Sequence, residues 1–219
     1  MNLLIIGAPG VGKGTMSNIL IEKQNLVHVS TGDMLRAAVK NQTPVGKLAS
    51  QYMDAGKLVP DEVIHDIIVE RLSQDDIKQG FLFDGYPRTL AQAIDLDKIL
   101  QELNMKIDAV INLLIEDDVV VKRITGRRTC NNCGAIYNIY FGAPKTENVC
   151  DKCGSQLSMR KDDNIESLSK RLEEFHKNTQ PVIEYYAKQN LVHDIQGDQA
   201  IDDGYSQIES VLEGLKWFR

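Results

Sequence analysis

A glycine-rich stretch near the start of the chain constrains the fold more than any other feature of the sequence. The stretch GAPGVGKGT, residues 7–15, follows directly on the apolar run LLII at residues 3–6. Its four glycines remove β-carbons that would keep successive backbone N–H groups from converging on one point. From Met16 onward, apolar residues recur at helical spacing, and a helix N-terminus attracts anions. This order predicts a phosphate cradle; a glycine-rich turn without a ligand is the alternative.

Lys13 supplies the full positive charge of this loop. The P-loop pattern G-x-x-x-x-G-K is satisfied from Gly7 to Lys13, but Gly14 comes next and the hydroxyl follows one place later, at Thr15. In the ordinary P-loop, the hydroxyl directly after the lysine ligates Mg²⁺. We therefore expect Mg²⁺ to be held here mainly by nucleotide phosphates and water.

Length and charge limit the possible classes of protein. A chain of 219 residues fits one α/β domain with insertions, or two small domains. The formal net charge of −6 argues against nucleic acid or an anionic membrane as the main partner, although a local basic patch is compatible with it. The first six residues lack the basic start of a secretory signal, and no apolar run has the length of a membrane span. We expect a soluble, cytoplasmic protein.

Five apolar runs read as buried parallel strands: LLIIG, LVHVS, FLFDG, AVINLLI and LVHDIQG, beginning at Leu3, Leu26, Phe81, Ala109 and Leu191. Segments with helical spacing separate them. Apolar runs without strict alternation, divided by helices, predict an α/β fold with a doubly wound parallel five-stranded sheet. Ligands bind such sheets at the carboxyl ends of the strands, where GAPGVGKGT, STGDMLR and DGYPR fall. The order of the strands is not readable from the sequence.

Two segments interrupt this alternation. Residues 30–59 are helical in pattern and end in GKLVPDE. The segment from about 126 to 163 is poor in helix-forming residues, rich in turn residues, and carries all four cysteines. We interpret the second segment as a small inserted β-type subdomain.

The cysteines form two knuckles, Cys130-x2-Cys133 and Cys150-x2-Cys153, with sixteen residues between them. This spacing is typical of a zinc site. Four thiolates leave no coordination position open for water, so the pattern predicts one structural Zn²⁺ rather than a catalytic one. Two disulfides, which a reducing cytosol disfavours, and an iron–sulfur centre are the alternatives.

Charged side chains gather near the predicted ligand edge. Six arginines belong to this group: Arg36, Arg88, Arg123, Arg127, Arg160 and Arg171. Guanidinium is a permanent, forked donor that suits phosphate oxygens. Each arginine taken singly is more often a surface salt-bridge partner, but position at loop ends beside a P-loop favours phosphate binding. Asp84 ends the run FLFD, where a Walker-B-type carboxylate orients Mg²⁺ and its waters; a helix cap or turn former is the alternative.

Together these motifs resemble the adenylate kinase family, in its longer form with a zinc-bearing lid. GAPGVGKGT is similar to the family's phosphate loop, STGDMLR and GKLVPDE to its monophosphate-binding insert, and DGYPRTLAQ to its central signature. GRR with the two knuckles resembles the lid, and RKDD with SLSKRL the basic segment after it. In this family, a glycine commonly follows the lysine, so Gly14 after Lys13 agrees with the family pattern. Tyr86 stands where the signature has phenylalanine, an aromatic exchange that we expect to leave the site intact.

The resemblance implies a P-loop core at residues 1–29, 60–125 and 164–219, a monophosphate-binding insert at 30–59 and a zinc-bearing lid at 126–163. It also implies an ATP site, with Lys13 on the transferring phosphoryl group, Arg123 and Arg127 clamping from the lid side, and the Gln199 carbonyl on the adenine amino group. The remaining ATP-site residues implied are Gly10, Val11, Gly12, Gly14, Thr15, Ile136 and Tyr137.

The same resemblance implies an AMP site. Arg36 and Arg88 would hold the α-phosphate of AMP, and Arg160 and Arg171 would bridge both nucleotides. The residues implied around the base and the rest of AMP are Thr31, Lys57, Leu58, Val59, Gly85, Tyr86, Pro87 and Gln92. Lys13, Asp84 and the arginines other than Arg36 form the implied catalytic set.

The implied reaction is reversible phosphoryl transfer from Mg-ATP to AMP, giving two ADP. It needs positioning and charge neutralisation rather than a nucleophilic side chain. The family leads us to expect a monomer that binds ATP, AMP and ADP, and neither nucleic acid nor membrane. Two alternatives stay open: a kinase for another nucleoside monophosphate, and a zinc-ribbon nucleic-acid-binding protein with a vestigial nucleotide site.

Overall fold

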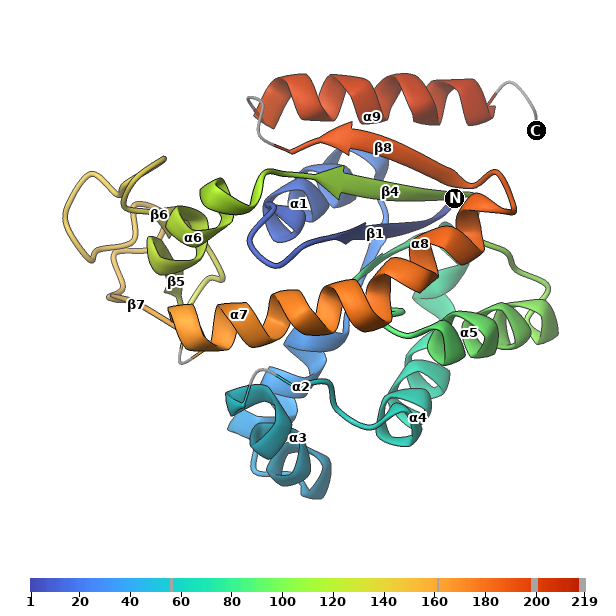
Figure 1. The fold of residues 1–219 in the computed structure, drawn as a ribbon, viewed down its shortest axis with the longest axis horizontal. Helices are drawn as coiled ribbons and strands as arrows, with labels where there is room; N and C mark the ends of the chain where they lie inside the picture. Colours follow the sequence, from blue (N-terminus) through green and yellow to red (C-terminus); the bar gives the residue numbers. More distant parts are fainter. Residues whose placement is uncertain (56, 161, 198–200, 217–219) are drawn as a thin grey trace.

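The computed structural model describes residues 1–55, 57–160, 162–197 and 201–216. Its centre is a sheet of five parallel strands in the spatial order β2-β3-β1-β4-β8 (Figure 1). The strands are β1 (Asn2–Gly7), β2 (Val27–Ser30), β3 (Phe81–Asp84), β4 (Ala109–Leu114) and β8 (Val192–Gln196). Each agrees with one of the five predicted apolar runs to within one residue at either end. The doubly wound α/β fold predicted from the sequence is confirmed.

Both faces of this sheet are buried at its central strands, which explains why β1 is apolar throughout, whereas the edge strand β8 (VHDIQ) carries polar residues and is partly exposed. Side chains alternate between the two faces of a strand. In β1, Leu3 and Ile5 join one core, while Leu4 and Ile6 join the other. All four residues are fully or almost fully buried. A strand with two buried faces needs apolar residues at every position, so it shows no polar alternation.

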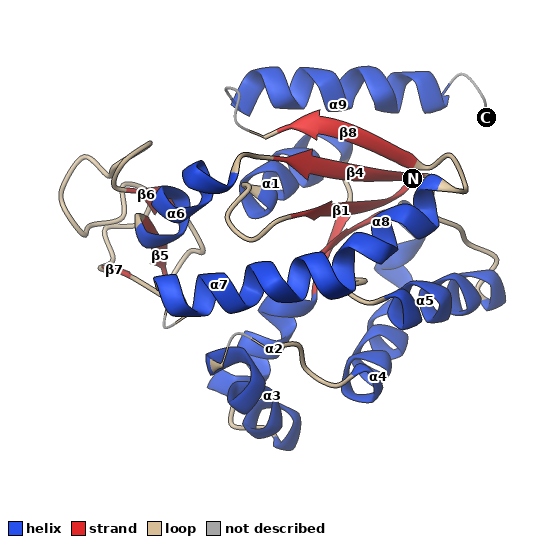
Figure 2. Ribbon diagram, in the orientation of Figure 1, coloured by secondary structure: helices blue, strands red, loops and turns tan. Residues whose placement is uncertain are grey.

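Helices cover the two faces (Figure 2). One core includes side chains from α1 (Lys13–Gln24) and α9 (Ile201–Lys216). The other includes side chains from α4 (Asp61–Leu72), α5 (Leu90–Glu102) and α8 (Gln180–Ala187). A short 3₁₀ turn, η1 (Asp75–Gln79), leads into β3. The two layers therefore bury both faces of the sheet.

The first interruption of the strand–helix alternation consists of α2 (Thr31–Lys40) and α3 (Pro44–Asp54). The Ser30 side chain caps α2 by accepting from the N–H of Asp33, and the Thr43 side chain caps α3 by accepting from the N–H of Gly46. Gly46 lies against the main chain of Ala38, where a β-carbon has no room. The close packing of these two helices therefore depends on that glycine.

The second interruption is a small antiparallel sheet, as its composition predicts. After α6 (Asp117–Thr125), strand β5 (Arg127–Cys130) pairs with β6 (Ile136–Asn138) on one side and β7 (Leu157–Ser158) on the other. This sheet lies beyond the carboxyl ends of β1 and β4 (Figure 1). The cysteine-bearing segment therefore stands over the edge at which the sequence places the ligand motifs.

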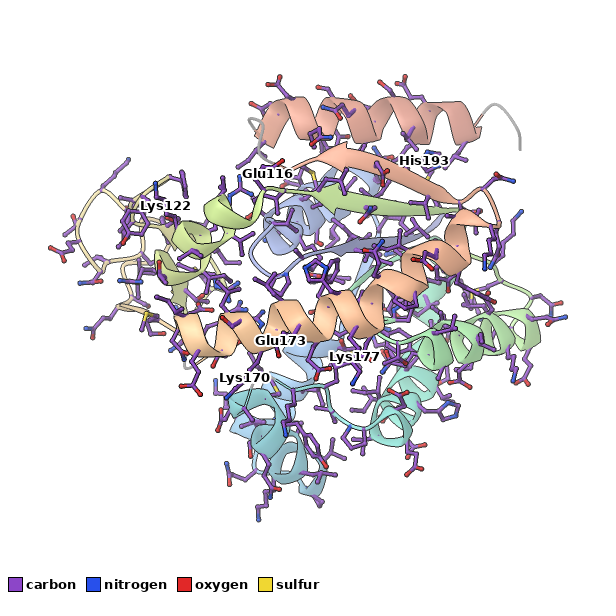
Figure 3. The ribbon with its side chains drawn as sticks, viewed as in Figure 1. Glu116, Lys122, Lys170, Glu173, Lys177 and His193 are labelled. Carbon is purple, nitrogen blue, oxygen red and sulfur yellow. The ribbon has the colours of Figure 1, made fainter. Side chains whose placement is uncertain are left out.

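A long helical stretch runs from the small sheet back across the central one. It consists of α7 (Ile165–Glu174), the π-helical turn η2 (Phe175–Thr179) and α8. Its exposed side carries charged residues, among them Lys170, Glu173 and Lys177 (Figure 3). Among the helices described, none combines the length and the apolar character that crossing a membrane requires.

Candidate active site

The carboxyl ends of β1, β2 and β3 border a cavity of about 1310 Å³. The glycine-rich loop forms one of its walls. Gly10 and Gly12 have φ angles of 84° and 107°, a backbone region that glycine occupies without steric cost. Helix α1 begins at Lys13, directly after the loop, and Lys13, Gly14 and Thr15 line the cavity. The positive end of the α1 dipole is therefore at the cavity wall, which favours an anion there.

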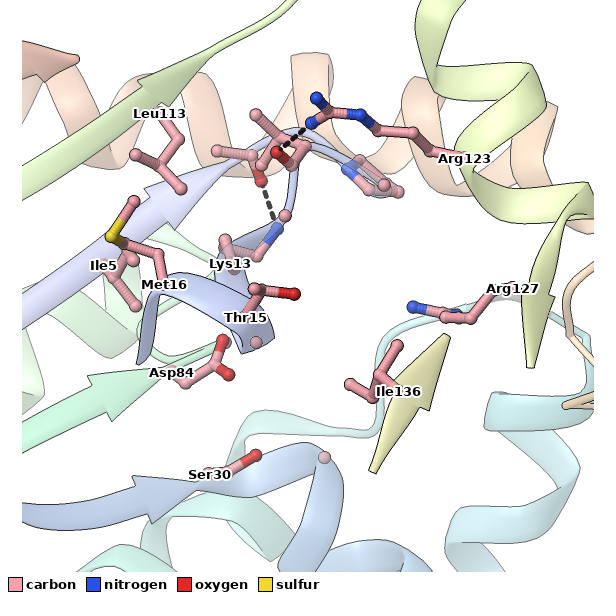
Figure 4. Close-up of a pocket in the computed structure, with 18 of the residues that line it drawn as sticks. Ile5, Lys13, Thr15, Met16, Ser30, Asp84, Leu113, Arg123, Arg127 and Ile136 are labelled. Carbon is pink, nitrogen blue, oxygen red and sulfur yellow. Dashed lines mark hydrogen bonds between the residues drawn. The ribbon is translucent and has the colours of Figure 1, made fainter. Parts of the chain in front are cut away.

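Lys13 folds back over this loop. Its Nζ donates hydrogen bonds of 2.6 Å to the carbonyl of Gly7 and 3.0 Å to the carbonyl of Ala8. Figure 4 shows the ammonium group between the loop and Asp84. Burial lowers the pKa of Lys13 to about 7, opposed by the negative charge of Asp84 and reinforced by the positive charge of Arg88. A bound polyphosphate would reverse this effect, since negative charge favours the protonated form.

Asp84 ends β3 and lines the same cavity, with its side chain 15% exposed. Burial by itself would raise the pKa of this carboxyl, but the neighbouring His28 imidazole and Lys13 ammonium outweigh that effect and hold the pKa below its usual value. The His28 Nε2 lies 3.7 Å from a carboxylate oxygen of Asp84. Asp84 is therefore a largely buried, ionised carboxylate beside the phosphate loop.

Two arginines of the cavity are paired with consecutive aspartates. Arg127 binds the Asp163 carboxylate through Nε and Nη2, with an Nε–Oδ2 distance of 2.8 Å. Arg171 Nη1 lies 2.9 Å from Oδ2 of Asp162. The Asp163 side chain has no solvent exposure, and a carboxylate in such a position requires a paired cation. These pairs fix two guanidinium groups at the cavity wall.

Arg36 pairs with an aspartate of its own helix, whereas Arg123 binds a main-chain carbonyl. Arg36 Nη2 lies 2.6 Å from Oδ1 of Asp33, one turn earlier in α2. Arg123 Nη1 donates a hydrogen bond of 2.6 Å to the carbonyl of Val11, in the phosphate loop itself (Figure 4). Arg123 thus connects α6 to the loop.

Arg88 and Arg160 are the arginines whose pKa values are most strongly lowered. Burial, together with the charge of Arg171, lowers the pKa of Arg88 to about 10. Burial, together with the charge of Arg127, lowers the pKa of Arg160 to about 10. Arg88 Nε donates a hydrogen bond of 2.7 Å to the carbonyl of Gly85. Both groups stay protonated near neutral pH, so the cavity concentrates positive charge and suits a polyanion.

A second cavity, of about 90 Å³, adjoins the first. Thr31 and Gln92 line it, and both are at least 95% buried. The Thr31 hydroxyl donates a hydrogen bond of 3.0 Å to the carbonyl of Gly85. The two cavities share Gly32, Arg36, Leu58, Gly85, Tyr86, Arg88 and Arg171. Two compartments therefore meet at a group of arginines.

The four cysteines come together at the end of β5. The Sγ atoms of Cys130 and Cys153 are 3.4 Å apart, those of Cys133 and Cys150 are 3.5 Å apart, and all four lie within 4.8 Å of one another. Thiolates at the Zn–S distance form a tetrahedron with edges of about 3.8 Å. The cysteines are free, and the sulfurs are farther apart than the length of a disulfide bond, about 2.05 Å. The cluster fits one metal ion and contradicts the disulfide alternative.

Comparison with known proteins identifies the family. The family model described as "Adenylate kinase" matches residues 5–191. The chain belongs to the adenylate kinase family. A curated adenylate kinase of Archaeoglobus fulgidus is 50% identical over 216 residues, which are 99% of this chain and 100% of that protein. Those of Geobacillus sp. (strain WCH70) and Bacillus subtilis are 50% and 48% identical over 216 residues, with the same coverage of both chains.

In this member of the adenylate kinase family, the implied nucleotide-site residues that the structure describes all lie at one of the two cavities. The large cavity is lined by Gly10, Val11, Gly12, Lys13, Gly14, Thr15, Asp84, Pro87, Arg123, Arg127, Ile136, Tyr137 and Arg160. The small cavity is lined by Thr31, Lys57, Val59 and Gln92, and the shared wall by Arg36, Leu58, Gly85, Tyr86, Arg88 and Arg171. Gln199 lies outside the described residues.

The structure adds partners to the adenylate kinase site that the sequence does not single out. Asp61 contacts Gln92, and the Thr179 hydroxyl donates to the carbonyl of Arg88. Asp162 and Asp163 stand out in the sequence only as the end of the lid segment, whereas in the structure they pair with arginines. The sequence signal for these ion pairs is that two adjacent acidic residues lie next to the basic segment.

Proposed function

We propose that this chain transfers the γ-phosphoryl group of Mg-ATP to AMP, reversibly, giving two ADP. Membership of the adenylate kinase family supports this reaction. One observation carries the proposal further: a large cavity beside the phosphate loop and a small one beside Gln92 share the wall that contains Arg36, Arg88 and Arg171. Two nucleotides that meet end to end would bring their phosphates to that wall.

On the ATP side, Lys13 would contact the transferring phosphoryl group, and the N–H groups of the loop would surround the donor phosphates. Arg123 and Arg127 would clamp ATP from the side of the small sheet. The loop residues assigned to this role are Gly10, Val11, Gly12, Gly14 and Thr15. Ile136, Tyr137 and the carbonyl of Gln199 would contact adenine. The burial of Lys13 and its lowered pKa support a role beside negative charge.

On the AMP side, Arg36 and Arg88 would hold the α-phosphate, and Arg160 and Arg171 would bridge both nucleotides. The remaining residues assigned to AMP are Thr31, Lys57, Leu58, Val59, Gly85, Tyr86, Pro87 and Gln92. Thr31 and Gln92 supply polar groups in a small, mostly buried compartment, which suits the edge of a base.

Phosphoryl transfer proceeds mainly through alignment and charge stabilisation. Lys13 and Arg88 would neutralise charge on the transferring group, and fixed hydrogen bonds would keep both side chains in place without reorganisation. Asp84 is an ionised carboxylate that fits an outer position around the Mg²⁺ of Mg-ATP. When bound with ATP, Mg²⁺ would supply positive charge that offsets part of the phosphate charge.

Closure of the two inserts would exclude water, the competing acceptor. We assign the phosphate-loop core to residues 1–29, 60–125 and 164–219, the AMP insert to 30–59 and the lid to 126–163. Cys130, Cys133, Cys150 and Cys153 would hold one Zn²⁺. The approach of the four sulfurs to within 4.8 Å of one another supports this assignment, and a closed shell would give the metal a structural role.

We further infer that the protein acts in the cytoplasm as a monomer whose partners are ATP, AMP and ADP, and not nucleic acid or membranes. The formal net charge of −6 supports the exclusion of polyanionic partners.

Phosphorus NMR tests the function directly. The protein is mixed with Mg-ATP and, in parallel, AMP, GMP, CMP, UMP or no acceptor. We expect ADP to accumulate rapidly only with AMP, with slow hydrolysis when no acceptor is present. Hydrolysis without transfer would refute the two-nucleotide site, and preference for another monophosphate would refute the roles of Thr31 and Gln92. Lys13→Met should lose at least about a hundredfold in rate, whereas Lys78→Met, at an exposed lysine, should not.

A further inference from the structure

Asp61, the first residue of α4, contacts the side chain of Gln92 across the boundary between α4 and α5. Its Oδ1 accepts a hydrogen bond of 2.6 Å from Gln92 Nε2, and its Oδ2 accepts one of 3.1 Å from the Thr89 hydroxyl. On the other side of the same amide, Gln92 Oε1 accepts a hydrogen bond of 2.7 Å from the main-chain N–H of Arg88. The Gln92 amide is therefore held at both ends.

These two contacts fix which way the amide faces. A carboxylate can only accept a hydrogen bond and a backbone N–H can only donate one. If the amide turned over, its oxygen would face the Asp61 carboxylate and its NH₂ group would face the N–H of Arg88. Both contacts would become repulsive, and Gln92 is only 5% exposed, so water offers little compensation.

The fixed orientation leaves one N–H on Nε2 and one lone pair on Oε1 for a ligand. Gln92 lines the small cavity, to which the proposed function assigns the base of AMP. Adenine presents an acceptor at N1 and a donor at its amino group. Hypoxanthine and guanine present the reverse, a donor at N1 and an acceptor at O6. A glutamine that could turn over would bind either base.

From this geometry we propose that Asp61 is a specificity-determining residue. It locks the Gln92 amide in the orientation that matches adenine and rejects 6-oxopurines. Asp61 acts through Gln92 and is a positioning residue rather than a catalytic one. This inference rests on the proposed function, because it assumes that the small cavity receives the acceptor base.

The position of Asp61 suits this role. It lies at the start of α4, where a carboxylate is favoured by the helix dipole and the helix fixes its backbone. Glu62, the next residue, is equally acidic and exposed in the same first turn. Glu62 therefore provides a matched control for the loss of one negative charge from this helix end.

The test compares kcat/KM for AMP and for IMP in the wild type, Asp61→Asn, Asp61→Ala and Glu62→Gln. IMP differs from AMP only at the N1 and C6 edge. Asparagine can donate as well as accept, so Asp61→Asn removes the lock while keeping the shape of the side chain. We expect the AMP-to-IMP ratio to fall at least about tenfold in both Asp61 variants, and to stay at the wild-type value in Glu62→Gln.

The outcomes separate this inference from the proposed function. A wild type that transfers phosphoryl to no monophosphate would refute the proposed function. A wild type that uses AMP, with unchanged ratios in both Asp61 variants, would refute the lock alone. General damage to the fold would lower kcat/KM for AMP and IMP together and leave their ratio unchanged, which also counts against the lock. Melting temperatures of all four proteins establish that folded enzymes are compared.

Discussion

The hydroxyl of Thr179 donates a hydrogen bond of 2.9 Å to the main-chain carbonyl of Arg88, 91 residues earlier in the chain. Thr179 is buried and is the last residue of the π-helical turn η2. Such turns are rare and occur frequently at functional sites. Here the turn belongs to the helical stretch that follows the lid segment, so this bond connects that stretch to the loop that carries Arg88.

Removal of the Thr179 hydroxyl should therefore reduce both activity and stability. We expect Thr179→Val to lower kcat about tenfold, because it loosens the segment that positions Arg88. The unpartnered carbonyl should cost about 1–3 kcal/mol of unfolding free energy. Thr179→Ser keeps the hydroxyl and should retain most of the activity. Steady-state kinetics and urea unfolding measure both effects; equal kcat values for the valine and serine variants would contradict the positioning role.

The lowered pKa of Lys13 predicts a proton linkage to nucleotide binding. With a pKa of about 7, Lys13 is mostly neutral at about pH 8, and the phosphates of ATP should raise the pKa and protonate it. Binding should then take up to about one proton, and the affinity should weaken as the pH rises above about 7. Calorimetric titrations in buffers of different ionisation enthalpy measure this uptake.

Lys13→Met is the control for that linkage, since it removes the titrating group and should abolish most of the uptake. Arg88, with a pKa of about 10, is protonated throughout this pH range and should contribute little. Equal proton uptake by the wild type and Lys13→Met would show that another group titrates on binding.

The sequence predicts those parts of the molecule whose signals are local. The central strands are largely apolar runs because both faces of the sheet are buried there, and the boundaries of all five strands agree to within one residue. The glycine-rich loop and the cysteine knuckles depend on short spacings, and their residues come together as expected. The residues that line the two cavities follow instead from the resemblance of these local motifs to the adenylate kinase family.

Contacts between distant segments were not predictable in this way. The Asp61–Gln92 and Thr179–Arg88 pairs depend on how α4, α5 and η2 pack, which no spacing in one sequence encodes. The strand order β2-β3-β1-β4-β8 is likewise set by tertiary packing. The sequence does not predict the π-helical turn either, because the apolar residues through α7 and α8 have the spacing of one continuous α-helix.

The pairing of Arg127 with Asp163 should dominate the stability of the segment between the lid and α7. Asp163 is fully buried, and Arg127→Met would leave it with only the more distant Arg171, whose Nη1 lies 4.0 Å from Oδ1 of Asp163. We expect a loss of up to about 3–5 kcal/mol in unfolding free energy, because Arg171 compensates part of the charge. Arg127→Met combined with Asp163→Asn removes both charges and should recover a large part of that loss. Urea denaturation measures these differences.

Arg128 provides the matched control for the Arg127 prediction. It donates hydrogen bonds to the carbonyls of Thr125 and Arg127, with no carboxylate partner among its hydrogen bonds in the described structure. Arg128→Met should cost about 1 kcal/mol. If the single Arg127→Met variant and the double variant were equally stable, the buried charge would not be the cause.

The cysteine cluster should bind one metal ion per chain, and elemental analysis of the purified protein should find zinc. Removal by a chelator should lower the melting temperature, because small domains with few buried apolar residues depend on metal binding for stability. Among the described residues of this segment, the buried apolar cluster consists of Cys130, Cys150 and Leu157, with the partly buried Ala135 and Tyr137 packed against it. Cys133→Ser should have the same effect in the absence of chelator, and Glu147→Gln, at an exposed residue of the same segment, is the control outside the cysteine cluster. Visible absorption from iron would favour the iron–sulfur alternative, and an unchanged melting temperature after verified metal removal would refute the structural role.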